Sequence, residues 1–115
     1  MAKPIFHARN SARKFGGKHT DYLFIHDLID DPKAHHASMK FRIIFHSSYG
    51  IFLVEKILGH EFINSDDRVV SVRAVAEQHV LEDLGFIPSL DDYLREMLEQ
   101  PWMAGMKKAK LVNVD

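Results

Sequence analysis

The chain has 115 residues, 46% of them hydrophobic and 27% charged, and a formal net charge of −1 with its histidines neutral. A chain of this length fits one globular domain with a single core, and its charge balance argues against broad, non-specific binding to nucleic acids. Cysteine is absent, which excludes disulfides, thiolate catalysis and every metal site that needs a cysteine ligand.

The N-terminus reads MAKPIFHARNSARKFGG and contains no uninterrupted apolar stretch, so it does not resemble a secretory signal. No segment approaches the roughly 18 apolar residues of a membrane span. We therefore expect a cytoplasmic protein without membrane association. Histidine is the compositional anomaly: the chain has 8, and they are dispersed rather than gathered in a tag.

The first two predicted helices are short. A proline near the start can open a helix over residues 4–14, and the pair Gly16-Gly17 would end it. Residues 21–30 are predicted to form the second helix. Its apolar residues cover much of its circumference, which places His26 close to the core.

One long helix is predicted to follow. Asp31-Pro32 combines an N-cap with a proline at the first helical position, and the next credible stop is Gly59. These signals indicate a helix of about 27 residues, roughly 40 Å long. Because its surface is apolar over a broad arc, we expect it to lie at the centre of the fold.

The polar residues of this long helix share one wedge of its surface when they are sorted at 100° per residue. The wedge contains no acidic residue and consists of His35, Ser38, Arg42, His46, Tyr49 and Lys56. It is either the solvated side of the helix or the lining of a site. His35 and His46 would lie about 16 Å apart along the axis, so they cannot bind the same metal ion.

Apolar residues flank a turn-forming run in the next segment, which predicts a β-hairpin near residues 61–72. A helix over residues 72–84 should follow, ended by Gly85 in the left-handed conformation. A capping box of Ser89 and Asp92 marks the start of another helix.

Trp102 is expected to dock the end of the chain onto the body. Residues 104–115 are predicted to form a C-terminal tail that is either loose or the edge strand of a homo-oligomer. The sequence therefore predicts a mainly α fold, a compact single domain over residues 1–103 of about five helices around one long central helix, with one small β-hairpin.

His79 and Asp83 lie four residues apart in the predicted helix 72–84, in the middle of its buried stripe. At this spacing an imidazole and a carboxylate can approach one metal ion or form a hydrogen-bonded pair in the core. Neutral imidazoles with a carboxylate suit zinc, iron, nickel or manganese. The spacing alone is far less specific than the H-E-x-x-H motif.

Two further patterns carry weaker signals. The bend RKFGGK at residues 13–18 is basic and rich in glycine, so its backbone N–H groups could converge on an anion; the alternative is a helix end with surface lysines. The doublet His26-Asp27 is similar to that of metal-dependent phosphohydrolases, which also need ligands from several other helices.

The motifs HARNSARKFGG, KAHH, FHSSYGIF, AEQHVLEDLG, IPSLDDYL and PWM occur in this order. Together they resemble a family of small bacterial and phage proteins that is classed as a domain of unknown function, over about residues 4–103. The resemblance implies recurring polar positions at His7, Arg13, Lys14, His26, Lys33, His35, Arg42, His46, Glu77, His79 and Asp83. One departure is the hairpin turn, where the family tends to have Asp-Gly-Arg and this chain has Asp66-Asp67-Arg68, so that a different turn conformation could result.

Three functions remain open at this point, as does whether the protein is an enzyme. The first is a divalent-metal site between helices, hydrolytic if an open coordination position holds water, with the ligands His46, His79, Asp83, His26 and His7. The second is non-enzymatic binding of a small anionic ligand such as a nucleotide, which phage occurrence would link to sequestration, through Arg13, Lys14, His35, Arg42, Tyr49 and Lys56. The third is a structural or interaction module whose histidines satisfy hydrogen bonds in the core.

Overall fold

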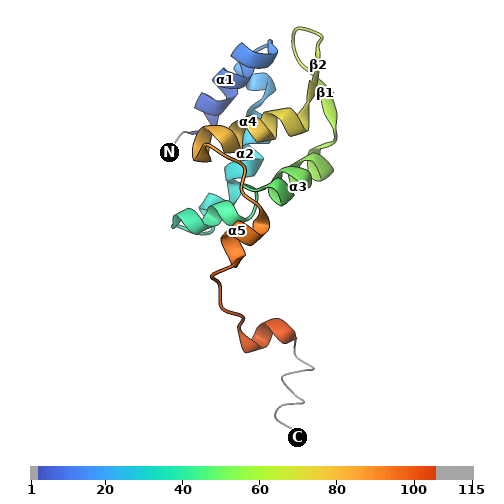
Figure 1. Ribbon diagram of the computed structural model, residues 1–115. Coiled ribbons are helices and arrows are strands. Elements are labelled where there is room, and N and C mark those ends of the chain that lie inside the picture. The colour runs from blue at the N-terminus through green and yellow to red at the C-terminus, as the bar shows by residue number, and fades with distance from the viewer. Residues whose placement is uncertain (1–2, 106–115) are drawn as a thin grey trace, which may run out of the picture.

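A computed structural model describes residues 3–105 of the chain. Five α-helices and a two-stranded antiparallel hairpin confirm the predicted mainly α class (Figure 1). The helices are α1 (Pro4–Phe15), α2 (Leu23–Asp30), α3 (Ser48–Leu58), α4 (Val72–Leu84) and α5 (Leu90–Leu94). The strands are β1 (Glu61–Ile63) and β2 (Val69–Ser71). Short 3-10 helices occupy His19–Asp21, Asp31–Ala34, Met39–Ile43 and Pro101–Ala104. None of the helices in this part of the chain is both long and apolar enough to cross a bilayer.

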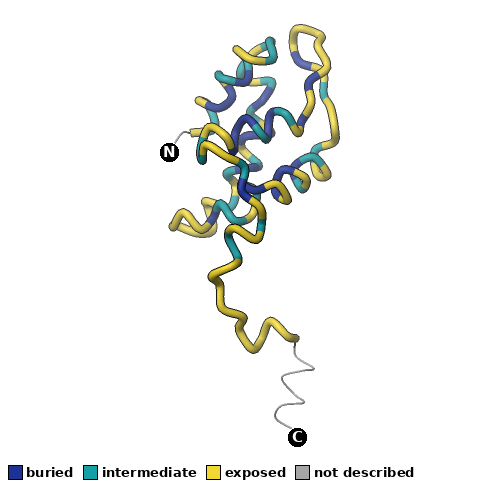
Figure 2. Tube along the Cα trace, in the orientation of Figure 1, coloured by how far each residue is buried: buried dark blue, intermediate teal, exposed yellow. Residues whose placement is uncertain are grey.

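Helix α4 lies at the centre of the body and packs against α1, α2, α3 and β2. Its stripe of Val72, Ala76 and Val80 is fully buried, as the sequence predicts. Ile25 of α2 and Val54 of α3 complete the core around it. Figure 2 shows this concentration of buried residues where α1, α2, α4 and the start of α3 meet.

Several helix ends lie where the local sequence places them. α1 begins at Pro4 and is ended by Gly16, whose φ is 89°. α4 spans the predicted residues and is ended by Gly85 in the left-handed conformation, at φ 79°. Ser89 and Asp92 form the predicted capping box of α5. These signals act over three or four residues, so they do not depend on the tertiary fold.

The predicted long central helix is wrong. Its residues form two 3-10 helices, a turn and then α3, which begins only at Ser48. Ser38 and Ser47 each accept a backbone N–H as N-caps, from Lys40 and Gly50 respectively, so their side chains start new helices where one continuous helix was expected. Gly50 also packs so closely on the backbone of Phe45 that a Cβ would clash there. The polar wedge therefore does not exist as one helix face.

The hairpin pairs Glu61 with Ser71, Phe62 with Val70 and Ile63 with Val69. Val70 points into the core, whereas Ile63 and Val69 are exposed. In the turn, Asp67 has a φ of 59°, a left-handed conformation that glycine adopts at little cost. The backbone at residue 67 thus has a conformation that suits the glycine expected there from the resemblance, although this chain has aspartate.

The C-terminal part of the domain differs from the prediction. Trp102 is 72% exposed and Leu98 is 77% exposed, so neither docks onto the body. Figure 1 shows the segment after α5 leading away from the helices, and Figure 2 shows it exposed along its length. The predicted tail, residues 104–115, lies outside the described residues from 106 onward.

Candidate metal centre

The five residues predicted as metal ligands come together in the interior. His7 comes from α1, His26 from α2, His46 from the link before α3, and His79 and Asp83 from α4. Each of the four histidines is fully buried. Asp30, the last residue of α2, joins them although the sequence analysis did not single it out.

Two imidazoles and two carboxylates form the centre of this group, and we call Asp30, His46, His79 and Asp83 the four-residue cluster. Nε2 of His79 lies 3.1 Å from Asp30 Oδ1 and 3.2 Å from Asp83 Oδ2. Nε2 of His46 lies 2.9 Å from Asp83 Oδ2 and 3.6 Å from Asp30 Oδ1. One potential ligand atom from each residue lies within 4.8 Å of all the others, an arrangement that is geometrically compatible with a metal ion.

The four-residue cluster is largely buried, although Asp30 also lines a surface pocket together with Lys3, Asp27 and Lys33. Its imidazoles are 0% exposed, and the carboxyl side chains of Asp30 and Asp83 are 9% and 2% exposed. The Arg42 guanidinium lies 4.0 Å from Asp83, too far for a close ion pair. Two carboxylates are therefore buried together with little cationic compensation from arginine.

Electrostatics at the four-residue cluster follows from these contacts. Burial raises the pKa of Asp83, but the imidazoles of His46, His7 and His79 around it lower the pKa more, so it lies well below its usual range. Burial lowers the pKa of His79, but its hydrogen bonds to Asp30 and Asp83 outweigh burial and raise it. Asp83 is therefore ionised, and His79 takes up a proton more readily than an ordinary imidazole.

The other two perturbed histidines stay neutral. Burial, together with neighbouring His79 and His7, lowers the pKa of His26 to about 2. Burial also lowers the pKa of His46, against the opposing hydrogen bond to Asp83. A neutral imidazole has a lone pair and can bind a metal without first losing a proton.

A second layer of polar residues surrounds the four-residue cluster. His26 Nδ1 lies 2.9 Å from His79 Nδ1, and the ring of His7 stacks on that of His79 with centroids 3.9 Å apart. Nδ1 of His7 donates to Glu82 Oε1 at 2.7 Å, and Nε2 of His7 lies 3.2 Å from Asp83 Oδ1. All these residues belong to α1, α2 and α4, which pack against one another.

The local sequence explains how the residues of the cluster are positioned. Asp30 follows His26 by four residues on α2, just as Asp83 follows His79 on α4, so the H-x-x-x-D spacing occurs twice. This second occurrence was the signal that could have identified Asp30. His46 is fixed differently: its carbonyl accepts a hydrogen bond from Tyr93 of α5, at 2.6 Å.

The residues predicted to bind an anion are not gathered. Arg13 bonds to Asn10 at the end of α1, and Lys14 lies over its neighbour Phe15. Arg42 lies beside the four-residue cluster, while the remaining three are spread over other segments: His35 follows the 3-10 helix Asp31–Ala34, and Tyr49 and Lys56 are exposed on α3.

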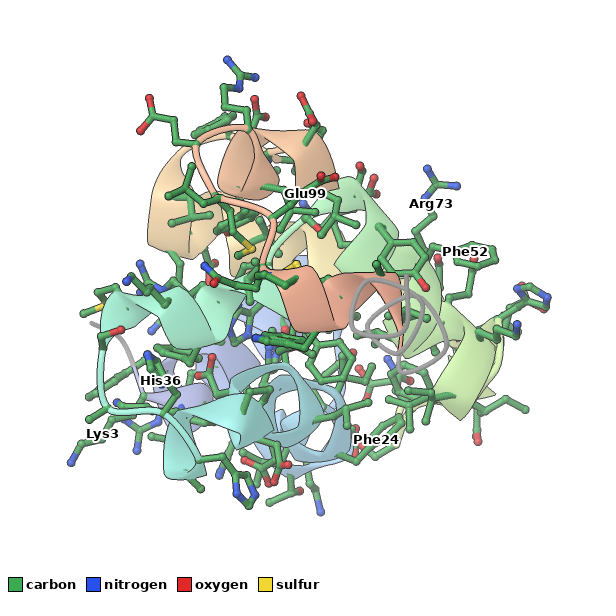
Figure 3. All side chains as sticks on the ribbon, turned by 90° about the horizontal axis from the view of Figure 1, so that it is seen from below. Lys3, Phe24, His36, Phe52, Arg73 and Glu99 are labelled. Carbon is green, nitrogen blue, oxygen red and sulfur yellow. The ribbon has the colours of Figure 1, made fainter. Side chains whose placement is uncertain are left out.

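His35 lines a groove of about 720 Å³ with His36, Lys40, Phe41 and several apolar residues. The four-residue cluster does not line this groove. Figure 3 labels His36 and Phe52 on opposite sides of the molecule, and both residues are exposed. This groove is therefore separate from the buried histidines.

The basic, glycine-rich bend does hold an anionic group, but one from the same chain. The backbone N–H of Gly17 donates to Asp66 Oδ2 of the hairpin turn at 2.8 Å. Asp21 accepts from the backbone and hydroxyl of Ser65 in the same turn. The bend thus fastens the hairpin to α1. Asp27, the second member of the predicted doublet, is exposed and lies outside the cluster.

The fold and the four-residue cluster define a small helical domain built around buried imidazoles and carboxylates. A family model described as "Domain of unknown function (DUF6915)" matches residues 2–103, nearly all of the chain, and the chain belongs to this family. No curated protein and no solved structure matches it. The resemblance stated from the motifs is thereby confirmed as to the family, and function rests on the chain's own residues.

Proposed function

We propose that this domain binds one divalent metal ion through Asp30, His46, His79 and Asp83. The observation that carries the proposal is the alternating arrangement of nitrogen and oxygen atoms. Each imidazole Nε2 faces both carboxylates, at separations from 2.9 to 3.6 Å. A ring nitrogen has at most one proton and can donate it to one carboxylate well, so hydrogen bonds account for only part of this convergence.

The separations suit a metal ion. Ligand atoms at about 2.1 Å from a metal lie about 3.4 Å apart in a tetrahedral site and about 3.0 Å apart when adjacent in an octahedral one. The four nitrogen–oxygen separations bracket both values. Two imidazoles with two carboxylates are a donor set that zinc, manganese, iron and nickel accept.

Charge supports a cation at the same place. Asp30 is the last residue of α2 and Asp83 the second-last of α4, so both carboxylates lie at the negative ends of their helices. Acidic residues there are disfavoured by about 0.3–1 kcal/mol each, and a cation is favoured. A divalent ion would neutralise both carboxylates in a largely buried site, where charges that are not fully balanced cost most.

The ion's proposed role is to join segments. The ligands come from α2, from the link before α3 and from α4, which are distant in the sequence. Hydrolysis, which the sequence analysis left open for this metal site, needs an open coordination position that a substrate can reach. Because the imidazoles are fully buried, and the surface pocket beside the cluster is reached by Asp30 but not by His46, His79 or Asp83, the arrangement supports metal-stabilised structure better than metal-dependent catalysis.

The test is metal binding by untagged, chelator-treated protein, measured calorimetrically with zinc and with manganese. We expect one ion per chain, and at least about 100-fold weaker binding by His46→Gln because a ligand is lost. His60→Gln is the matched control, because His60 is exposed and also lies beside a carboxylate, 3.2 Å from Glu55. No binding by the wild-type chain, or equal losses in the two variants, would refute the proposal.

A further inference from the structure

Ser11 begins a chain of buried hydrogen bonds that leads to the four-residue cluster. Its Oγ lies 2.6 Å from Gln78 Oε1, 3.0 Å from the backbone oxygen of His7 and 2.7 Å from Nε2 of His26. The first two partners can only accept, so they take the single hydroxyl proton. The contact with His26 therefore requires the ring to donate its Nε2–H to Ser11.

The orientation of the Gln78 amide is fixed independently. Its Nε2 donates to the backbone oxygen of His7 at 3.0 Å and to Glu82 Oε2 at 2.9 Å. Both of these partners are acceptors, so the amide nitrogen must face them and the amide oxygen must face Ser11. The direction of the chain follows from groups whose donor and acceptor roles leave no choice.

His26 passes this constraint on to His79. It is fully buried, and among the described residues no carboxylate lies within ion-pair distance of it, so a cationic ring there would be an uncompensated charge. A neutral ring with a proton on Nε2 has its lone pair on Nδ1. Because Nδ1 of His26 lies 2.9 Å from Nδ1 of His79, it accepts the Nδ1–H of His79. Nε2 of His79 is then the atom turned toward Asp30 and Asp83.

We propose that Ser11 and His26 are positioning residues that hold His79 with Nδ1 protonated and Nε2 directed into the four-residue cluster for metal binding. The proposal rests on the metal site proposed above and adds the residues that tune it. Outer partners of metal-binding histidines typically change affinity 10–100-fold. His46 lacks such support, since its Nδ1 has no hydrogen-bond partner within the described part of the chain.

The direction of the hydrogen bonds from Ser11 to His79 can be tested without metal or mutation. Long-range proton–nitrogen NMR of chelator-treated, nitrogen-15-labelled protein reports which ring nitrogens carry protons. We expect His26 to have its proton on Nε2 and a bare Nδ1, and His79 to have a proton on Nδ1. A proton on Nδ1 of His26 would mean that the hydrogen bonds run in the opposite direction, and it would overturn the proposal.

The positioning role is tested by zinc affinity. Ser11→Ala removes the acceptor for His26, so that the proton can move to Nδ1 of His26 and His79 can protonate at Nε2; we expect 10–100-fold weaker binding. Ser11→Thr keeps the hydroxyl and should stay within about 3-fold of wild type, a rescue that a role in packing alone would not produce. Equal affinity of Ser11→Ala and wild type would overturn the positioning role while leaving the metal site intact. Absence of zinc binding by wild type would overturn the metal site, whereas the NMR pattern would still decide the direction of the chain.

Discussion

Replacing Asp83 by asparagine removes the most heavily contacted charge in the structure while keeping its shape. Oδ2 of Asp83 lies 2.9 Å from His46 Nε2 and 3.2 Å from His79 Nε2. Hydrogen bonds to a charged group contribute about 1.5–3 kcal/mol each, and an amide oxygen would restore about 1 kcal/mol for one of them. We therefore expect Asp83→Asn to lower the free energy of unfolding of metal-free protein by about 2–5 kcal/mol at pH 7.5.

The assay is urea unfolding in the presence of EDTA, followed by circular dichroism. Asp27→Asn is the control, since Asp27 is an exposed aspartate on α2 and its loss should cost less than about 0.5 kcal/mol. Saturating zinc should widen the gap between wild type and Asp83→Asn, by about 2.7 kcal/mol at 100 times the wild-type dissociation constant if the variant no longer binds.

The pH dependence gives a second check on the same variant. Because the pKa of Asp83 is lowered in the folded state, its contribution to stability is present above its ordinary value of 3.8 and is lost as pH falls below it. The difference between wild type and Asp83→Asn should therefore persist from pH 7.5 to about 5 and shrink below about pH 4. A metal-free variant within about 0.5 kcal/mol of wild type at pH 7.5, or a control that loses as much, would refute the reasoning.

Three further outcomes are expected. With EDTA present, His26 takes up a proton on unfolding below pH 6.5, because its folded pKa is about 2. The free energy of unfolding should therefore fall by about 1.4 kcal/mol per pH unit between pH 6 and 4 on account of His26. His26→Gln should remove that part of the pH dependence, and parallel stability curves for wild type and variant would contradict this. Asp67→Gly should raise the free energy of unfolding by up to about 1 kcal/mol in urea titrations, because φ is 59° there, and a clear loss would contradict it. Trp102 is the only tryptophan, and its exposure predicts fluorescence emission like that of the unfolded chain. Trp102→Ala should lower the free energy of unfolding by less than about 0.5 kcal/mol. A blue-shifted emission that strengthens with protein concentration would show instead that Trp102 is buried against another molecule.

Predictions from the sequence succeeded where a few neighbouring residues decide the outcome. Pro4, Gly85 and the capping box at Ser89 act through local backbone geometry, and each lies at the helix end where it was expected. The prediction of one long helix failed because hydrophobic periodicity shows which residues are apolar, not whether the chain turns between them. Ser47 offers the backbone a cap, and only tertiary packing determines whether the chain uses it.

The residues of the candidate site show the same difference between local signals and tertiary packing. His79 and Asp83 were identified because polar groups interrupted a buried stripe, and a buried polar group needs a partner. His46 was singled out from a helix face that does not exist, and it lies in the four-residue cluster for a different reason, the position of the link before α3. Asp30 was overlooked because it precedes Asp31-Pro32, which was interpreted as a helix start; its carboxylate reaches the cluster only through the packing of α2 against α4.

The four-residue cluster contains only nitrogen and oxygen donors, and the chain contains no cysteine. Sites with thiolate ligands can lose their metal when the sulfur is oxidised, which makes them sensors of redox conditions. Imidazole and carboxylate do not undergo that chemistry, but their metal affinity depends on competition with protons. A metal held here would therefore persist through oxidative stress and be released by acid.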